Sequence, residues 1–374
     1  MKTITLLTLG AETDVHHMLA LGARLQQQGR HVRLAAAPEF QPLAKKLGLC
    51  FQPIEVPAKI KNRKSNIKPH KSGTLLRQIR QLAETSSLMA IHQPYPALLP
   101  ALGPLPCPVM GIALQAEEAF ASLEDKKGLL SRLASRIRGR RPRAGSCLPT
   151  LYNFSPQLLA GGENAASALR FTGQWAIPDS LQWILSGRGP SPALGDWLFR
   201  GGRPVFFDFS QAPESECSYL LNLVEGLSEK MGFRAILCTG WADYKEGVLR
   251  RDIYHVKSPV QEWLFGQCAA VVHYRNCEKL PAAIRAGVPG ILFASGQEAK
   301  NWGKILAGKG IGIHRSEEPP TAASLEAALE EALRLSMQYK ARMMGKALQE
   351  EDGLAHAVRV IGEQVEEEMV AKAV

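Results

Sequence analysis

Three residues near the beginning of the sequence have the side chains that acid–base chemistry requires. Asp14, His16 and His17 follow a short apolar run and stand where a helical pattern begins. A carboxylate at the start of a helix lies near the positive end of the helix dipole, so it stays ionised and can accept a proton. Aspartate is also among the best helix caps. Residue type alone therefore leaves two interpretations of Asp14 open, a general base or a cap of the helix that begins at Val15.

The sequence argues against several other kinds of site. No histidine, aspartate and glutamate residues have the spacing of metal ligands, and the G-x-S-x-G turn of serine hydrolases does not occur. The seven cysteines are scattered singly, which is typical of reduced thiols in a cytoplasmic protein. The first ten residues are predicted to form a buried strand rather than a secretory signal. We therefore expect no metal and a cytoplasmic location.

Alternating strands and helices predict two domains of one type. The first half combines helical patterns at 15–28 and 39–47 with β-prone runs at 4–9, 31–36, 50–54, 87–91 and 108–114. The alternation begins again with predicted strands at 204–209, 234–238, 253–256, 269–273 and 290–293 and predicted helices at 217–230, 261–265, 280–286 and 321–335. Strand–helix–strand units of this spacing form parallel sheets. We expect an α/β protein of two doubly wound, Rossmann-like domains that face each other across a cleft.

The domain boundaries are predicted from composition. Residues 174–203 are rich in proline, glycine, serine and tryptophan, which favours an interdomain linker. The N-terminal domain then covers 1–173 and the C-terminal domain covers 204–350. The last residues, 351–374, are predicted as a helical tail. A chain of 374 residues has the usual length of two domains.

The net positive charge of the chain comes from residues 1–150. The whole chain has a formal net charge of +10, and residues 1–150 alone carry 22 lysines and arginines against 9 aspartates and glutamates. Most of the excess lies in two stretches, 58–80 and 126–143. Such stretches are typical of a surface that contacts an anionic membrane or an acidic partner, and equally of a solvated surface without a ligand. They contain no aromatic residue, which argues against nucleic acid as a partner.

Several segments resemble family 1 glycosyltransferases of the bacterial and sterol type. The opening LLTLGAETDVHHMLALGARLQQQGRHV is similar to the family pattern G-x-x-G-D-V-x-P-x-L-A-L followed by G-H-x-V. Seven later segments occur in family order and spacing: FTGQW, PVFFDFS, SPVQEWLF, CAAVVH, AAIRAGVP, NWGKILAGKGIG and EDGLAHAV. The resemblance covers nearly the whole chain, except 56–150. It implies the GT-B fold, a small-molecule acceptor in the N-terminal domain, a UDP- or dTDP-linked sugar as co-substrate in the C-terminal domain, and inversion of the anomeric carbon.

The resemblance also assigns roles to single residues. Asp14 matches the aspartate that serves as the base in the family, and His16 and His17 replace the polar residue and the proline that usually follow it. Adjacent side chains point in different directions, so at most one of the two histidines can assist. The residues that correspond to the donor contacts are His273, Arg275, Asn276, Lys279, Glu298, Ser210 and Gln211.

The donor segments depart from the family where it has glycine. The family pattern H-H-G-G-A-G-T-T reads HYRNCEKL at 273–280, so the glycines that let backbone N–H groups approach phosphate are absent. Glu278 and Asp208 bring carboxylates to two phosphate-binding loops instead. The family's Asp-Gln pair corresponds to Glu298 and Ala299, which retains only the carboxylate.

Two functions are compatible with this pattern. The first is a hexosyltransferase-like enzyme that transfers a sugar to a hydroxyl of a small hydrophobic or lipid-like natural product, with Arg275 and Lys279 supplying charge to the donor phosphates. The second is a pseudoglycosyltransferase that has lost nucleotide-sugar binding. Such a protein would act as a binding or scaffold protein or catalyse a non-glycosyl reaction on a bound acceptor. The fold does not separate the two, since one fold hosts many functions.

Overall fold

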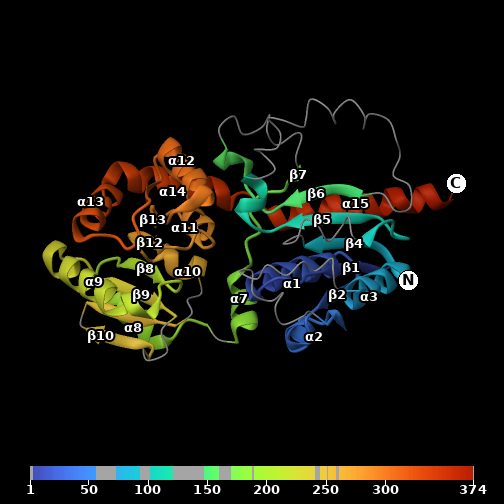
Figure 1. Cartoon of the computed structure of the whole chain (residues 1–374), viewed down its shortest axis with the longest axis horizontal. Helices are drawn as coiled ribbons and strands as arrows, with labels where there is room; N and C mark the ends of the chain where they lie inside the picture. Colours follow the sequence, from blue (N-terminus) through green and yellow to red (C-terminus); the bar gives the residue numbers. More distant parts are fainter. Residues whose placement is uncertain are drawn as a thin grey trace. The chain divides into compact units, whose positions relative to one another are not determined.

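The chain divides into two compact units (Figure 1). The computed structural model describes residues 3–55, 73–92, 102–120, 147–159, 170–187, 189–240, 245–250, 252–257 and 261–373. Unit 1 contains the described residues of Met1–Gln157, Gly161–Leu185 and Asp352–Val374. Unit 2 contains those of Leu158–Ala160 and Ser186–Glu351. The C-terminal segment therefore belongs to the same unit as the N-terminal segment.

Unit 1 is built on a parallel sheet with the strand order β3-β2-β1-β4-β5-β6-β7. The strands are β1 Thr3–Leu7, β2 His31–Ala36, β3 Cys50–Pro53, β4 Ser86–His92, β5 Val109–Ala113, β6 Cys147–Tyr152 and β7 Arg170–Phe171. The helices are α1 Glu12–Gln27, α2 Gln41–Lys46, α3 Gly73–Glu84, α7 Asp179–Ser186 and α15 Gly353–Ala373, with 3-10 turns η1 Pro38–Phe40 and η3 Pro156–Leu158. The order reverses between β1 and β4, and such a switch point leaves a crevice outside the carboxyl ends of the two strands.

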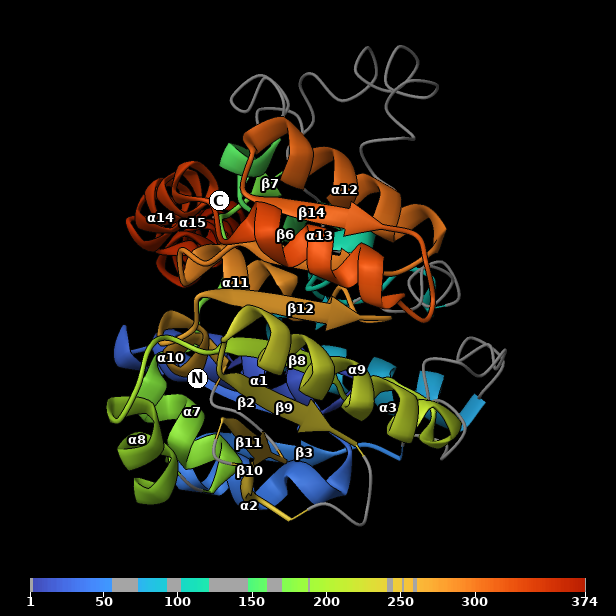
Figure 2. The same cartoon turned by 90° about the vertical axis from the view of Figure 1, so that its left-hand side faces the viewer.

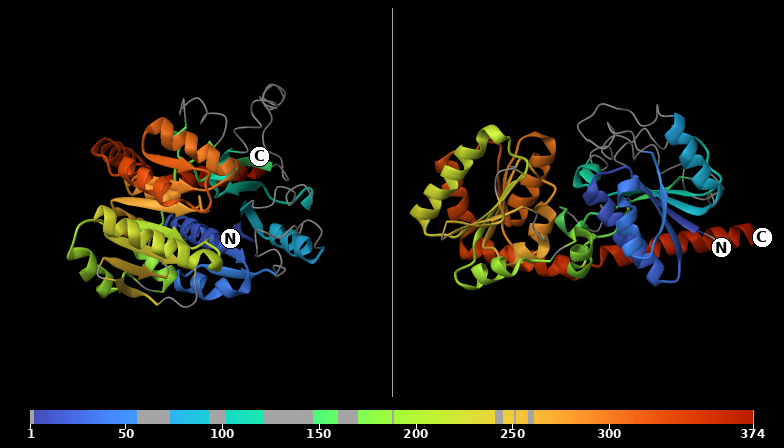
Figure 3. Two further views of the ribbon diagram at one scale, coloured as in Figure 1. Left: turned by 60° about the vertical axis from the view of Figure 1, so that its left-hand side comes forward. Right: turned by 90° about the horizontal axis from the view of Figure 1, so that it is seen from below.

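Helices cover both faces of the unit 1 sheet. On β1, Ile4 and Leu6 point to the face covered by α1 and α15, and Leu7 points to the face covered by α3. This alternation buries the strands on both sides, as expected for parallel sheets. Helix α15 lies beside α1 (Figure 3), and the ion pair between Arg24 and Asp352, 2.5 Å between Nη2 and Oδ2, joins the two helices at one end.

Unit 2 repeats this architecture with the strand order β10-β11-β9-β8-β12-β13-β14. The strands are β8 Val205–Phe209, β9 Ala235–Thr239, β10 Gly247–Arg250, β11 Ile253–Val256, β12 Ala270–Tyr274, β13 Gly290–Phe293 and β14 Gly312–Arg315. The helices are α8 Pro192–Phe199, α9 Cys217–Met231, α10 Gln261–Gly266, α11 Leu280–Arg285, α12 Gly296–Lys309, α13 Ala322–Ala332 and α14 Leu335–Gln349, with the 3-10 turn η4 Glu214–Glu216. Only the β10–β11 pair is antiparallel among the described pairs of this sheet (Figure 2). The switch point lies between β8 and β12.

The predicted fold class is confirmed by these two doubly wound sheets. The predicted boundaries of the domains stay predictions, and the structure adds two facts about them. The segment 174–203 contains α7 and α8, and α8 buries Leu194 and Trp197 in a core cluster of unit 2. The basic stretch 126–143 and residues 58–72 of the other lie outside the described residues, whereas 73–80 form part of α3.

The contact between α11 and α14 depends on a glycine, which gives a testable prediction. A Cβ added at Gly345 of α14 would lie 2.4 Å from Cα of Gly287, the residue that ends the turn after α11. We therefore expect Gly345→Ala to lower the free energy of unfolding by about 1–3 kcal/mol, measured by urea denaturation. The matched control is Gly226→Ala in α9, where a Cβ meets no atom within 4 Å and alanine favours the helix. Equal effects of the two substitutions would contradict the prediction.

Candidate active site

Asp14 lies at the switch point of the unit 1 sheet. The chain leaves β1 and enters α1 with Ala11 as the N-cap residue and Asp14 at the third helical position. Asp14 Oδ2 accepts a hydrogen bond of 2.9 Å from the backbone N–H of Ala11, and the whole residue is buried. Gly10 permits this approach, because a Cβ there would lie 2.2 Å from Oδ2. The helix begins at Glu12 and not at Val15, and the Asp14 carboxylate caps it from the third helical position by reaching back to the N-cap residue. The role of Asp14 as a base stays a prediction.

Two further polar side chains lie next to Asp14. Gln115, two residues after β5, donates from Nε2 to Asp14 Oδ1 at 2.9 Å. His92, the last residue of β4, is fully buried, with Nε2 3.9 Å from the same Oδ1 and Nδ1 3.1 Å from Thr8 Oγ1. Sequence reasoning missed Gln115 and His92, although a histidine directly after the predicted strand 87–91 was a usable signal. The carboxyl edge thus holds a carboxylate and an imidazole whose nearest atoms are 3.9 Å apart, close enough for their charges to interact.

The two histidines of α1 contact their own helix. His16 Nε2 lies 3.7 Å from Glu12 Oε1, and burial lowers the pKa of His16 while the charge of Glu12 acts in the opposite direction. His17 Nδ1 lies 2.8 Å from the carbonyl oxygen of Thr13. Each of these contacts runs one turn toward the start of the helix. Their assistance to Asp14 stays a prediction.

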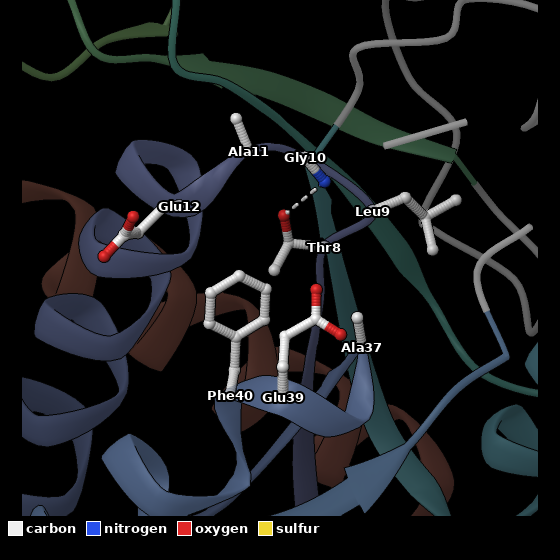
Figure 4. Close-up of a pocket in the computed structure, with 8 residues that line it drawn as sticks. All are labelled: Thr8, Leu9, Gly10, Ala11, Glu12, Ala37, Glu39 and Phe40. Atoms are coloured by element: carbon white, nitrogen blue, oxygen red, sulfur yellow. Dashed lines mark hydrogen bonds between the residues drawn. The ribbon is translucent and has the colours of Figure 1, made fainter. Parts of the chain in front are cut away.

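A cavity of about 360 Å³ opens beside this group (Figure 4). Its lining residues come from the ends of β1 and β2 and the turns that follow: Thr8, Leu9, Gly10, Ala11, Glu12, Ala37, Glu39 and Phe40. The Glu39 carboxylate is directed toward Thr8, with the Phe40 ring beside it. Asp14 does not line the cavity, but Ala11 does, and Ala11 donates its N–H to Asp14. Ala11 therefore connects the wall of the cavity to the Asp14 carboxylate through one hydrogen bond.

A second polar group lies at the switch point of the unit 2 sheet. Asp208 on β8 and His273 on β12 are partners in the register of the two strands, and both are fully buried. Lys279 Nζ lies 3.1 Å from both carboxylate oxygens of Asp208. Ser210 Oγ donates to Oδ1 at 2.6 Å and Asn276 Nδ2 to Oδ2 at 3.4 Å. Asp208 thus forms one network with three of the predicted donor residues, Ser210, Asn276 and Lys279, and His273 lies beside Asp208 on the neighbouring strand.

The network keeps its two charges ionised. Burial by itself would raise the pKa of Asp208, but the charge of Lys279 and the hydrogen bonds from Ser210 and Lys279 outweigh it and lower the pKa. Burial would lower the pKa of Lys279, but the attraction of Asp208 outweighs it and raises the pKa. Asp208 and Lys279 therefore form a buried ion pair at neutral pH. The positive charge that the resemblance assigned to donor phosphate is neutralised within the protein.

Arg275 is held by carboxylates outside this network. Its Nε lies 2.9 Å from Glu318 Oε2, and its Nη2 lies 3.3 Å from Glu216 Oε1. The backbone of Arg275 has φ of +56°, a conformation that glycine adopts readily and arginine rarely does. Arg275 stands where the resembled family has the first glycine of its phosphate loop. The glycine conformation is therefore retained although the glycine is not.

The remaining predicted donor residues occupy the surrounding turns. Asn276 Oδ1 accepts from the backbone N–H of Glu278 at 2.9 Å, which fixes the turn before α11. Gln211 is exposed in the turn after β8. Glu298 is half-buried in the first turn of α12. Their contacts to a donor stay predictions.

His273 is a buried, neutral histidine in the second group. Both ring nitrogens lack a hydrogen-bond partner among the described residues, and the ring stands edge-on to Phe265. Burial lowers the pKa of His273 to about 4, against the smaller opposing effect of Asp208. At neutral pH the ring carries no charge. It offers one N–H donor and one acceptor at the end of β12.

The lowered pKa of His273 predicts a loss of stability in acid. In the unfolded chain the ring takes up a proton near pH 6.5, whereas in the folded chain it does so only near pH 4. Stability is therefore complete above pH 6.5 and declines as the pH falls toward 4, by roughly 2 kcal/mol between pH 7.5 and 5 from this residue. Urea denaturation at several pH values checks this, with His273→Gln as the comparison. An unchanged pH dependence in the variant would contradict the assignment.

Two general features of the described residues bear on the kind of site. No group of three or more histidine, cysteine, aspartate or glutamate side chains among them could hold a metal ion. In the same part of the chain, no helix is both long and apolar enough to cross a membrane.

Comparison with known sequences gives one consistent result. No protein-family model matches the chain. The chain is 25% identical to a sterol 3-beta-glucosyltransferase of Aspergillus terreus over 97% of its own length, and it spans 30% of the length of that relative. It is also 25% identical to the O-mycaminosyltylonolide 6-deoxyallosyltransferase of Streptomyces fradiae, with 97% of both chains covered.

Solved structures show the same fold. The glycosyltransferase of kitacinnamycin superposes with a TM-score of 0.67 at 16% identity, over 97% of this chain and 98% of the other. The spinosyn forosaminyltransferase superposes with a TM-score of 0.68 at 16% identity, over 98% of this chain and 100% of the other. These similarities agree with the two doubly wound sheets and with the motifs in the sequence. The chain therefore has the GT-B fold, and its sequence is similar to those of family 1 glycosyltransferases.

Proposed function

We propose that the protein transfers a sugar from a nucleotide diphosphate to a hydroxyl of a small hydrophobic or lipid-like natural product, with inversion at the anomeric carbon. The observation that carries the proposal is the position of Asp14, a buried carboxylate at the carboxyl edge of the unit 1 sheet with His92 beside it. The relatives in sequence are named as transferases for a sterol and for O-mycaminosyltylonolide. These names support a natural-product acceptor.

The proposed chemistry needs one proton acceptor. The acceptor hydroxyl attacks the anomeric carbon, the bond from that carbon to the diphosphate oxygen breaks, and the diphosphate leaves with the electron pair. Asp14 takes the hydroxyl proton. The amide of Gln115 now donates to Asp14 Oδ1, so an incoming hydroxyl would take its place as donor to that oxygen. His92 Nε2 lies 3.9 Å from Asp14 Oδ1, near enough to stabilise the negative charge of the Asp14 carboxylate.

The leaving diphosphate needs compensating charge in unit 2. Lys279 and Asn276 are available there, together with the N–H of His273. In the proposed bound state, the Lys279 ammonium contacts the diphosphate while it remains beside Asp208. Two negative groups would then share one lysine, so we expect weaker donor binding than a glycine-rich phosphate loop provides.

Calorimetric titration with UDP, UDP-glucose and dTDP-glucose tests the proposal. Micromolar binding of one of them supports a working donor site. Arg275→Ala should then leave binding nearly unchanged, because the guanidinium is already paired with Glu216 and Glu318. Asn276→Ala should weaken the binding of the nucleotide or nucleotide sugar. Absence of binding up to millimolar concentration would contradict the proposal.

The buried pair Asp208–Lys279 favours one other function. Because the charge of Lys279 is balanced by Asp208 within the protein, this site needs no negatively charged ligand to neutralise it. A pseudoglycosyltransferase that binds an acceptor without a nucleotide sugar would have such a site. No titration signal for the wild-type protein, together with nucleotide binding gained in Asp208→Gly or Glu278→Gly, would favour this second function.

A further inference from the structure

Helix α14 exposes a row of apolar side chains to solvent. Leu335, Tyr339 and Met343 are 88%, 65% and 48% exposed, and their spacing of four residues places them along one side of the helix. The opposite side packs on α11 and buries Ala341 and Leu348. We call the three exposed residues the α14 ridge. Large apolar side chains gathered in this way on a surface usually mark a binding surface.

Positive charges lie on both sides of the ridge. At 100° per residue, Arg342 and Lys346 project beside the ridge on one flank and Lys340 on the other, and all three residues are exposed. We call these three residues the flanking cations. Helix α14 contains no aspartate or glutamate, and Arg334 precedes its first residue. The nearest acidic residue before the helix, Glu331, is directed to Arg315, with 3.9 Å between Oε2 and Nη2.

We propose that the α14 ridge and its flanking cations form a docking surface for an anionic membrane. A helix with a narrow apolar side bordered by lysine and arginine lies in the interface of a bilayer, with the apolar side chains among the acyl chains and the cations at the phosphates. Tyrosine suits that boundary because its ring is apolar and its hydroxyl remains hydrated. A protein partner is less well matched, since lysine is depleted in protein interfaces and three side chains provide little buried area.

This surface differs from the basic stretches of the first half and does not depend on the donor site. Helix α14 lies at the periphery of unit 2, alongside α11 (Figure 2), so vesicle binding can be measured whether or not the protein transfers sugar. An enzyme for a lipid-like acceptor would meet its substrate at such a surface.

Vesicle sedimentation of the full chain tests the proposal. We expect binding to phosphatidylcholine vesicles that contain phosphatidylglycerol and little binding to phosphatidylcholine alone. Serine at all three ridge positions should lower the partition coefficient at least roughly tenfold, and glutamine at all three flanking cations should do the same. These residues are exposed, so circular dichroism and the melting temperature should not change.

Two matched controls keep the test specific. The apolar control replaces exposed side chains elsewhere on unit 2 with serine: Phe199, Val248 and Leu249. The charge control replaces three lysines of α12 with glutamine: Lys300, Lys304 and Lys309. Both controls should bind vesicles like the wild-type protein.

Three results would overturn the proposal. The first is absence of binding to anionic vesicles by the wild-type protein. The second is equal binding by the wild-type protein and the α14 variants, which would assign binding to another part of the chain. The third is a dimer in light scattering that the ridge variant converts to a monomer without any vesicle binding, which would assign the ridge to contact between two copies.

Discussion

Asparagine in place of Asp14 is expected to lower the rate of sugar transfer by roughly 10²–10⁴-fold, because the proposed reaction loses its proton acceptor. The change is small in shape, and the asparagine side-chain oxygen can still accept the N–H of Ala11, as Asp14 Oδ2 does now. The loss should therefore appear in kcat more than in KM for the acceptor. Steady-state kinetics with the donor found by calorimetry measures both.

The control for Asp14→Asn is a carboxylate in a similar position without a role in the site. Asp179 lies in the first turn of α7 in the same unit and is exposed. Asp179→Asn should retain the wild-type rate and melting temperature. If Asp14→Asn kept its activity within about threefold, or lost activity only in proportion to unfolding, Asp14 would be a structural residue and not the base.

Removal of Lys279 is expected to destabilise unit 2 strongly. Lys279→Met leaves the fully buried Asp208 carboxylate without its counter-charge, which should cost about 3–5 kcal/mol of unfolding free energy. The double variant Asp208→Asn with Lys279→Met removes both charges. It should be clearly more stable than Lys279→Met alone. Urea denaturation of the four proteins in this cycle gives the coupling energy.

The pH dependence of that coupling has a defined sign. The pKa of Asp208 is lowered in the folded protein, so its contribution to stability is present above the unfolded value near pH 4 and disappears as the pH falls through the lower, folded value.

An exposed ion pair gives the control for Lys279→Met: Lys230 Nζ lies 2.6 Å from Glu326 Oε1 on the surface of unit 2. Lys230→Met should cost less than about 1 kcal/mol. Similar costs for the two lysines would contradict the assignment of Asp208–Lys279 as a buried ion pair.

The sequence was sufficient to predict the fold class and the approximate positions of most strands that the structure shows. Hydrophobic runs bounded by glycine and proline indicated β2 and β13 at the bounds that the structure shows. This works because parallel strands are buried on both faces and stand out as apolar runs. Helices α3, α7 and α8 and strands β6, β7 and β10 were not predicted. Helices α12 and α14 and strand β14 were not predicted either. Their buried positions are interrupted by glycine and charged residues, so local pattern is weak there.

The sequence by itself determined that the chain alternates strands and helices, and that Asp14, Asp208 and His273 lie after, in and at the end of predicted strands, respectively. Only the tertiary structure decided which of these side chains meet. His92 and Asp14 are 78 positions apart, and Lys279 and Asp208 are 71 positions apart, yet each pair lies together because neighbouring parallel strands end at one edge of a sheet. It also decided that α15 joins unit 1 and that the α14 ridge faces solvent. Periodicity shows that a helix has an apolar side, but the burial of that side depends on the neighbours that folding brings to it.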